Sequence, residues 1–258
     1  MASAEWSKRP RSCERGVVTA AIRRIGVLTG GGDCPGLNAA LRAVVRTALS
    51  RHGIEVVGIL DGYAGLVEGS GRPLSEAAVA GTLSRGGTII GTSNRSDPFR
   101  YVPEGAGAAV APADRSAEAL RQIGRFGIDA LVTIGGDGTL AIAHKLAGLG
   151  VALVGVPKTI DNDIAATDAS IGFDSALTIA TEAIDRLQTT ADAHHRVMVL
   201  EVMGRYAGWI ALRAGIAGGS EVILIPEIGY GAEHVASAIR RRIQRGKRSS
   251  IVVVAEGA

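Results

Sequence analysis

Aromatic side chains are scarce in this 258-residue sequence, which contains three Phe, four Tyr and two Trp. Proteins that bind single-stranded nucleic acid stack bases on aromatic rings, so this scarcity argues against nucleic acid as a partner. Long apolar runs are also missing, because no stretch approaches the roughly 20 apolar residues that a membrane-spanning helix needs. We therefore expect neither a nucleic-acid nor a membrane partner.

Cysteine is almost absent as well, and Cys13 and Cys34 form neither a metal-ligand spacing nor a disulfide framework. This usage is typical of a reducing, cytoplasmic location. The charge is uneven, since residues 1–24 hold six basic and two acidic side chains. We expect these residues to form a disordered basic leader, with a transit peptide as the alternative.

Glycine is abundant, with 36 residues, and it divides the chain into short segments. Apolar runs predict strands over residues 25–29, 54–60, 130–134, 151–156, 197–203, 222–225 and 251–254. Helical spacing of apolar residues predicts helices over residues 37–49, 75–83, 115–126, 139–146, 172–190, 206–216 and 232–244. This alternation is typical of the α/β class, with mostly parallel sheets and with ligands bound at the carboxyl ends of the strands.

Two of the predicted strands end in glycine clusters, at residues 30–32 and 135–138, each followed by a predicted helix. Glycine lets backbone N–H groups approach a phosphate, and the start of a helix attracts negative charge. Ordinary tight turns are the alternative for either cluster alone. Asp137 suits a Mg²⁺ ion beside phosphates, although it could equally cap the helix that follows.

A third strand ends in Lys158-Thr159-Ile160-Asp161-Asn162-Asp163, which places two carboxylates beside a hydroxyl and an amine. Phosphoryl transfer to an alcohol requires a base for the hydroxyl proton and donors to the phosphoryl oxygens. Asp161 could be that base, with Thr159 and Lys158 as donors. A solvated Asx-turn is the alternative.

Four motifs together resemble the 6-phosphofructokinase family and occur in that family's order. They are GGDCPGLN at 31–38, GGDGT at 135–139, PKTIDND at 157–163 and MGR at 203–205. The resemblance implies phosphorylation of the 1-hydroxyl of fructose 6-phosphate by ATP and Mg²⁺. It also implies two Rossmann-like lobes, a nucleotide-binding lobe at 25–157 and a sugar-phosphate-binding lobe at 158–258.

The resemblance assigns roles to individual residues. Asp161 is expected to be the general base, with Thr159 and Arg205 as further catalytic residues, and Asp137 is expected to bind Mg²⁺. The residues expected at the nucleotide are Gly31, Arg95, Asp137, Gly138, Thr139 and Lys158. Those expected at the sugar phosphate are Thr159, Asp161, Asp163, Arg196, Met203, Gly204, Arg205 and Glu256. Arg196 matches a residue that reaches into a neighbouring subunit, so a homo-oligomer, dimer or tetramer, is expected.

The phosphoryl donor depends on two positions. Lys158 is shared by pyrophosphate-dependent members and by an actinobacterial-like ATP-dependent group, whereas pyrophosphate users usually have aspartate at the position of Gly138. An aspartate there would repel the α-phosphate of a nucleotide. Gly138 therefore favours ATP, and pyrophosphate remains the alternative donor.

Allosteric regulation by a phosphorylated metabolite is a further expectation. The residues that match the family's effector site are Arg42, Arg46, Arg85, Glu221, Arg245, Lys247 and Arg248, with Gln188 where some members have arginine. A solvated helix end is the alternative for the basic residues near 245.

Members of the family continue beyond the position of Ala258, so we expect a C-terminally truncated member with an incomplete substrate site. A catalytically inactive nucleotide- or phosphate-binding relative is then an alternative. NAD kinases and lipid kinases carry a similar GGDGT motif, but the PKTIDND segment argues against them.

Overall fold

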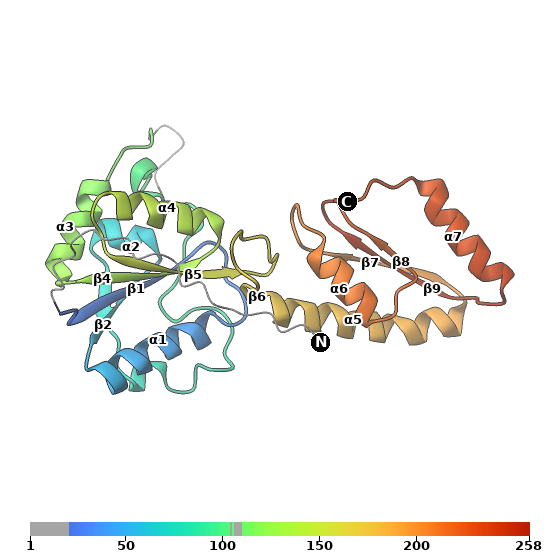
Figure 1. Ribbon diagram of the computed structural model, residues 1–258, viewed down its shortest axis with the longest axis horizontal. Coiled ribbons are helices and arrows are strands. Elements are labelled where there is room, and N and C mark those ends of the chain that lie inside the picture. The colour runs from blue at the N-terminus through green and yellow to red at the C-terminus, as the bar shows by residue number, and fades with distance from the viewer. Residues whose placement is uncertain (1–20, 104, 106–109) are drawn as a thin grey trace, which may run out of the picture.

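The computed structural model describes residues 21–103, 105 and 110–258, which form two α/β bodies along one long axis (Figure 1). Most of the expected leader, residues 1–20, lies outside the described residues. Arg24, its last residue, already opens the first strand, and its guanidinium pairs with Glu55. No helix among the described residues is long and apolar enough to cross a membrane.

The first body is built on a six-stranded sheet with the order β3-β2-β1-β4-β5-β6. Its strands are β1 (Arg24–Gly30), β2 (Glu55–Ile59), β3 (Gly71–Pro73), β4 (Ala130–Gly135), β5 (Leu153–Thr159) and β6 (Ile171–Gly172). All neighbouring pairs are parallel except β2 and β3. Gly30 lies opposite Gly135 in the register of β1 and β4, so the two glycine clusters leave the sheet side by side.

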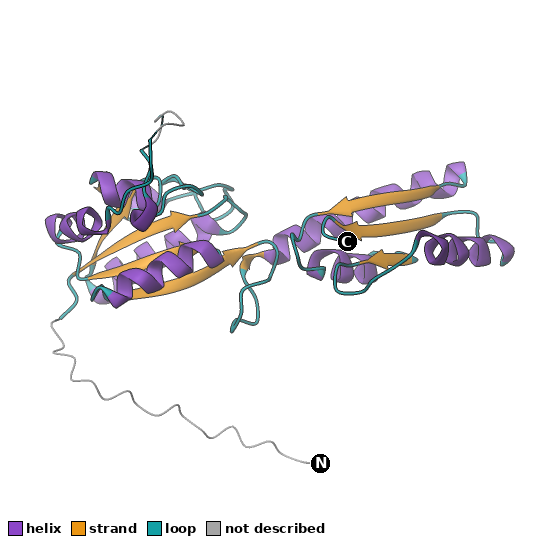
Figure 2. Ribbon diagram, turned by 90° about the horizontal axis from the view of Figure 1, so that it is seen from above, coloured by secondary structure: helices purple, strands orange, loops and turns teal. Residues whose placement is uncertain are grey.

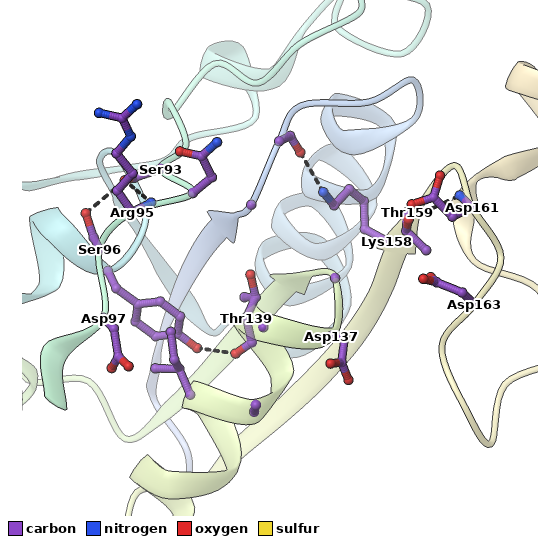
Figure 3. A pocket seen from close by; sticks show the side chains of 18 of the residues that line it. Ser93, Arg95, Ser96, Asp97, Asp137, Thr139, Lys158, Thr159, Asp161 and Asp163 are labelled. Carbon is purple, nitrogen blue, oxygen red and sulfur yellow. Dashed lines mark hydrogen bonds between the residues drawn. The ribbon is translucent and has the colours of Figure 1, made fainter. Parts of the chain in front are cut away.

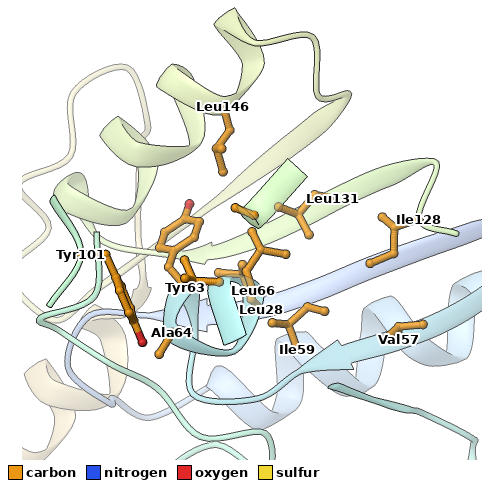
Figure 4. Packing of buried hydrophobic residues seen from close by; sticks show 12 residues of the cluster. Leu28, Val57, Ile59, Tyr63, Ala64, Leu66, Tyr101, Ile128, Leu131 and Leu146 are labelled. Atoms are coloured by element: carbon orange, nitrogen blue, oxygen red, sulfur yellow. The ribbon is translucent and has the colours of Figure 1, made fainter. Parts of the chain in front are cut away.

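Helices cover both faces of this sheet (Figures 1 and 2). They are α1 (Leu37–His52), α2 (Tyr63–Glu68), α3 (Ser116–Phe126) and α4 (Asp137–Gly148), with 3₁₀ turns η1 (Ala77–Val79) and η2 (Pro98–Arg100). Neighbouring residues of a strand point to opposite faces, so Val27 and Leu28, both fully buried, enter different cores. Leu28 packs with Leu66, Leu131 and residues of α4 (Figure 4), whereas Val27 packs against α1.

The second body has a three-stranded parallel sheet with the order β7-β9-β8. Its elements are α5 (Phe173–His194), β7 (Val197–Val202), α6 (Trp209–Ala217), β8 (Val222–Leu224), α7 (Ala232–Gln244) and β9 (Ser250–Ala255). Helices α5 and α6 bury one face of the sheet in a single core around Ile184 and Val253. The other face is open over β7, where Val199 is 63% exposed, and no residue of α7 is buried, although Val252 of the central strand is only 4% exposed.

Several features differ from the sequence-based predictions, among them the short strand β3, which was not predicted. The predicted helix over 75–83 is wrong, because only the 3₁₀ turn η1 forms there. Helix α2 was not predicted, since its six residues lie between Gly62 and Gly69 and are too few to show a helical period. The first sheet extends past the expected lobe boundary at 157/158, because β5 continues to Thr159 and pairs there with Gly172 of β6.

Candidate active site

A cavity of about 650 Å³ lies at the carboxyl ends of β1, β4 and β5, where a parallel sheet is expected to bind its ligand (Figure 3). Six segments supply its lining residues. These are Gly31 and Gly32 after β1, Tyr63 of α2, residues 93–97, residues between 136 and 145 in and just before α4, residues between 158 and 163 around the end of β5, and Arg205 from the second body. The cavity thus brings together most of the residues that the sequence predicted for catalysis and nucleotide binding.

The close packing of β1 and β4 explains two of the glycines. A Cβ atom on Gly30 or Gly135 would lie 2.6 or 2.4 Å from side-chain atoms of Thr139. The side chain of Thr139, only 6% exposed, therefore fills the space that these glycines leave. This packing brings the start of α4 against the sheet, with the positive end of the helix at the cavity.

The Gly31 backbone is held in a way that the sequence did not predict. Its N–H donates to the carbonyl of Ser93 at 3.0 Å, so this group is engaged within the protein rather than free for a phosphate. Gly31 has a φ of +82°, a left-handed conformation that favours glycine. The expected role of Gly31 at the phosphates therefore depends on its small size rather than on its N–H.

Lys158 is a buried cation in the cavity wall, with only 5% of its surface exposed. Its Nζ donates to the carbonyl of Gly32 at 2.5 Å, and none of the described carboxylates forms an ion pair with it. An ammonium group has three donors and needs compensating negative charge when it is buried. Lys158 therefore suits an anionic ligand such as a phosphate.

Asp161 and Asp163 lie across the cavity from Ser93 and Arg95 (Figure 3). Partial burial, and then the negative charge of Asp163, raises the pKa of the Asp161 carboxyl, while Arg205 acts in the opposite direction. The turn itself is made by Asn162, whose φ is +54° and whose Oδ1 accepts from the N–H of Ser170 at 3.0 Å. This bond spans eight residues, so it is not the Asx-turn considered from the sequence, and it ties the turn to Ser170 instead.

Asp137 is the first residue of α4, and its exposed side chain lines the same cavity. No hydrogen bond or ion pair engages this carboxylate within the described part of the chain, and it does not cap the helix. Among those residues, no group of three His, Cys, Asp or Glu side chains forms a ready-made metal site. Mg²⁺ usually takes one or two carboxylates and completes its shell with water and substrate phosphates, so Asp137 at a phosphate cavity fits this ion.

Arg205 reaches the cavity from the second body on a strained turn. Gly204 and Arg205 have φ values of +145° and +54°. Glu256 holds this turn, since its Oε1 accepts from the N–H groups of Gly204 at 3.2 Å and Arg205 at 2.7 Å. Glu256 was expected at a sugar hydroxyl, and the structure shows it first as the support for the turn that presents Arg205.

Several residues named from the sequence do not line the cavity. Met203, Gly204 and Glu256 adjoin it through the Arg205 turn, and Arg196 is exposed between α5 and β7. Conversely, the sequence analysis missed Tyr63, whose buried hydroxyl donates to the Thr139 carbonyl at 2.9 Å. Tyr63 follows Gly62, which comes three residues after the end of β2. A glycine shortly after a strand is the same pattern that identified the other loops.

Comparisons with known proteins identify the family. A family profile described as Phosphofructokinase matches residues 24–258. The chain belongs to the phosphofructokinase family. It is 52% identical over 92% of its length to ATP-dependent 6-phosphofructokinase 2 of Clostridium perfringens, of which it covers 65%. It is 53% identical over 91% of its length to a pyrophosphate--fructose 6-phosphate 1-phosphotransferase of Amycolatopsis methanolica, of which it also covers 65%.

The fold agrees as well. The structure of phosphofructokinase from Saccharomyces cerevisiae superposes with a TM-score of 0.80 at 37% identity, over 92% of this chain and 34% of the yeast chain. These matches confirm the predicted α/β phosphofructokinase fold. The chain spans about 65% of the length of the two bacterial phosphofructokinase relatives named above.

Proposed function

We propose that this chain transfers a phosphoryl group from ATP to the 1-hydroxyl of fructose 6-phosphate, the reaction of a glycolytic 6-phosphofructokinase. One observation carries the proposal. A single cavity joins a buried cation and a helix start, which suit phosphates, to a carboxyl with a raised pKa and an arginine from the second body. Phosphoryl transfer requires both sets of groups. The cation and the helix start suit the phosphates of the donor, and the carboxyl and the arginine suit the acceptor.

The proposed roles follow the chemistry of each side chain. Asp161 accepts the proton of the attacking hydroxyl, and its raised pKa moves it toward the pH range in which a general base works best. Lys158 and Thr159 donate to the transferring phosphoryl group, with Asp163 beside the acceptor. Arg95 and Arg205 bind phosphate oxygens, a task suited to the planar guanidinium group.

Asp137 would hold Mg²⁺, and the N–H groups of Gly138 and Thr139 would bind the donor phosphates at the start of α4. When it is bound, Mg²⁺ neutralises the charge of the donor phosphates. The positive charge of the ion would then balance the negative charge of the Asp137 carboxylate.

Pyrophosphate is the second candidate donor. The relative from Amycolatopsis methanolica, whose name specifies pyrophosphate, is about as similar to this chain as the ATP-dependent one. Gly138 favours ATP, because the space beside its Cα is empty to 4 Å and carries no negative charge. The cavity also continues beyond the phosphate end to Tyr63, Ile142 and Lys145, which leaves room for a nucleoside.

Other properties of phosphofructokinases remain proposals for this chain. They are a cytoplasmic location, a homo-oligomer in which exposed Arg196 reaches the sugar site of a neighbour, and an effector site at the basic residues listed from the sequence. For the oligomer, the supporting observation is that Arg196 does not line the cavity of its own chain.

The deciding experiment measures fructose 1,6-bisphosphate directly. The purified chain is supplied with fructose 6-phosphate, Mg²⁺, and either ATP or pyrophosphate. Turnover with ATP is the expected result, and turnover with pyrophosphate alone assigns the second donor. Absence of product from a folded chain that binds ATP contradicts the proposed activity and favours an inactive nucleotide-binding relative.

A further inference from the structure

The loop of residues 85–96 has little regular structure, yet it is fixed firmly to the first sheet. Asn38 of α1, 1% exposed, donates to the carbonyls of Arg85 and Gly86 at 3.0 Å each and accepts from the N–H of Ile89 at 2.9 Å. The hydroxyl of Thr29 donates to the Gly91 carbonyl at 2.7 Å. The loop therefore has a defined position along its whole length, up to the residues that enter the cavity.

The loop and the Gly31 turn are joined most closely at Thr92. Its hydroxyl is 2.7 Å from the Gly31 carbonyl and 3.2 Å from the Thr29 carbonyl. On the other side of the same residue, the Gly31 N–H donates to Ser93. Both backbone polar groups of Gly31 are thus bound by consecutive residues of the loop.

Lys158 binds the next carbonyl of the turn, that of Gly32. The turn is therefore held by Thr92 at the Gly31 carbonyl and by Lys158 at the Gly32 carbonyl. Lys158 lies on the Asp161 side of the cavity (Figure 3). Thr92 itself does not line this cavity. It lines an adjoining cavity that shares Gly31 and Arg95 with this one, and its hydroxyl is bound to backbone carbonyls. We therefore expect the hydroxyl to act on the reaction through the position of the turn and of Arg95, three residues further along the loop.

We propose that Thr92 is a positioning residue, whose hydroxyl fixes the Gly31 turn relative to Arg95 and Lys158 in the geometry that phosphoryl transfer requires. This inference rests on the proposed function. Displacement of reacting groups by about 1 Å can cost roughly 10²-fold in rate. Glycine at residues 30–32 gives the turn little stiffness of its own, so a fixed position must come from its partners.

The test compares Thr92→Val, which has nearly the same shape but no hydroxyl, with Thr92→Ser, which keeps the hydroxyl. We expect Thr92→Val to lower kcat by about tenfold or more, with a smaller change in the KM for fructose 6-phosphate and a Tm close to that of the wild type. Thr92→Ser should keep kcat within about threefold. Thr88→Val is the matched control, since Thr88 lies in the same loop and bonds to the Thr29 hydroxyl but not to Gly31.

A second readout does not depend on turnover. Deuterium exchange of the Gly31 amide should be as slow in the wild type as that of strand amides, and about tenfold faster in Thr92→Val than in Thr92→Ser. If the wild type makes no product, the proposed activity fails, while the exchange rates still decide the role of Thr92. If Thr92→Val does not fold, Thr92→Ala replaces it.

Three results would overturn the proposal. One is unchanged kcat and Gly31 exchange in the variant without a hydroxyl. Another is a larger loss in Thr92→Ser than in Thr92→Val, which would assign the effect to the methyl group that serine lacks. The third is fast exchange of the Gly31 amide in the wild type, which would show that the turn is not held.

Discussion

The two bodies of this chain differ in how completely their sheets are covered. The first sheet has helices on both faces and a buried core on each side, and β1, β4 and β5 hold the glycine turns and Lys158. The second sheet has one core, beneath α5 and α6, and an open face beside α7. The phosphate end of the cavity is thus fixed by packing, whereas Arg205 on the second body depends on a turn held by Glu256.

The largest effect is expected between the two bodies, at Asp161. Replacement by Asn should lower kcat by roughly 10²- to 10⁴-fold, the usual contribution of a general base. The acid limb of the wild-type kcat profile should lie above the ordinary range for aspartate, because the pKa of Asp161 is raised. Steady-state assays across pH measure both quantities, and a variant with wild-type turnover would remove Asp161 from catalysis.

The same variant should not lose stability. A carboxyl with a raised pKa is ionised at a cost in the folded state, so stability declines as pH rises through that pKa. Asn carries no charge, and the Tm of Asp161→Asn at neutral pH should therefore equal or exceed that of the wild type. A clear fall in Tm would indicate that Asp161 supports the fold as well.

The next largest effect is expected in the first core. Leu28 is completely buried between β1 and the helices on its face of the sheet. Leu28→Ala should lower the free energy of unfolding by about 2–5 kcal/mol, because it leaves a cavity in a close-packed core. Urea unfolding measures this change, and a loss below about 1 kcal/mol would show that the first body is less tightly packed than its two cores suggest.

An intermediate effect is expected at the phosphate end. Gly138→Asp should fit, since a Cβ there meets no atom within 4 Å, but its charge should raise the KM for ATP by about tenfold or more. Gly138→Ala fills the same space without charge and is the control, with an expected change of less than about threefold. Equal effects of the two variants would assign the change to size instead of charge.

The smallest effect is expected on the open face of the second sheet. Val199 is 63% exposed, so Val199→Thr should change the free energy of unfolding by no more than about 0.5 kcal/mol. The measurement is the same urea titration used for Leu28. A loss comparable to that of Leu28→Ala would mean that this face is covered in solution, and the contrast between the two bodies would disappear.

Much of the fold could be predicted from the sequence, because most elements are long enough to show their period. The predicted helix over residues 232–244 agrees with α7, and the predicted strand over 130–134 lies within β4. The extension of the first sheet to Thr159 could not be predicted, since the pairing of Thr159 with Gly172 joins residues that are separated by an irregular loop. Helix α2 lies between two glycines and is too short for its apolar residues to show a helical period.

The site, like the fold, could be predicted from the sequence only in part. Strand ends and glycine clusters predicted which loops would meet, and Lys158, Asp137 and Asp161 do line one cavity. The bond between Gly31 and Ser93 could not be foreseen, because it joins two irregular loops far apart in the chain. Glu256 was likewise visible as a candidate, but its support of the Arg205 turn depends on backbone conformation.

The edge of the first sheet contains its own chemical reporter. The thiol of Cys34, in the loop after β1, is buried against Gly172 of β6, and a Cβ on that glycine would lie 2.7 Å from the sulfur. Burial raises the pKa of this thiol to about 11, so it should react very slowly with alkylating reagents while β6 stays in place. The alkylation rate of Cys34 therefore measures how often β6, the strand from which α5 leaves the first body, separates from the loop after β1.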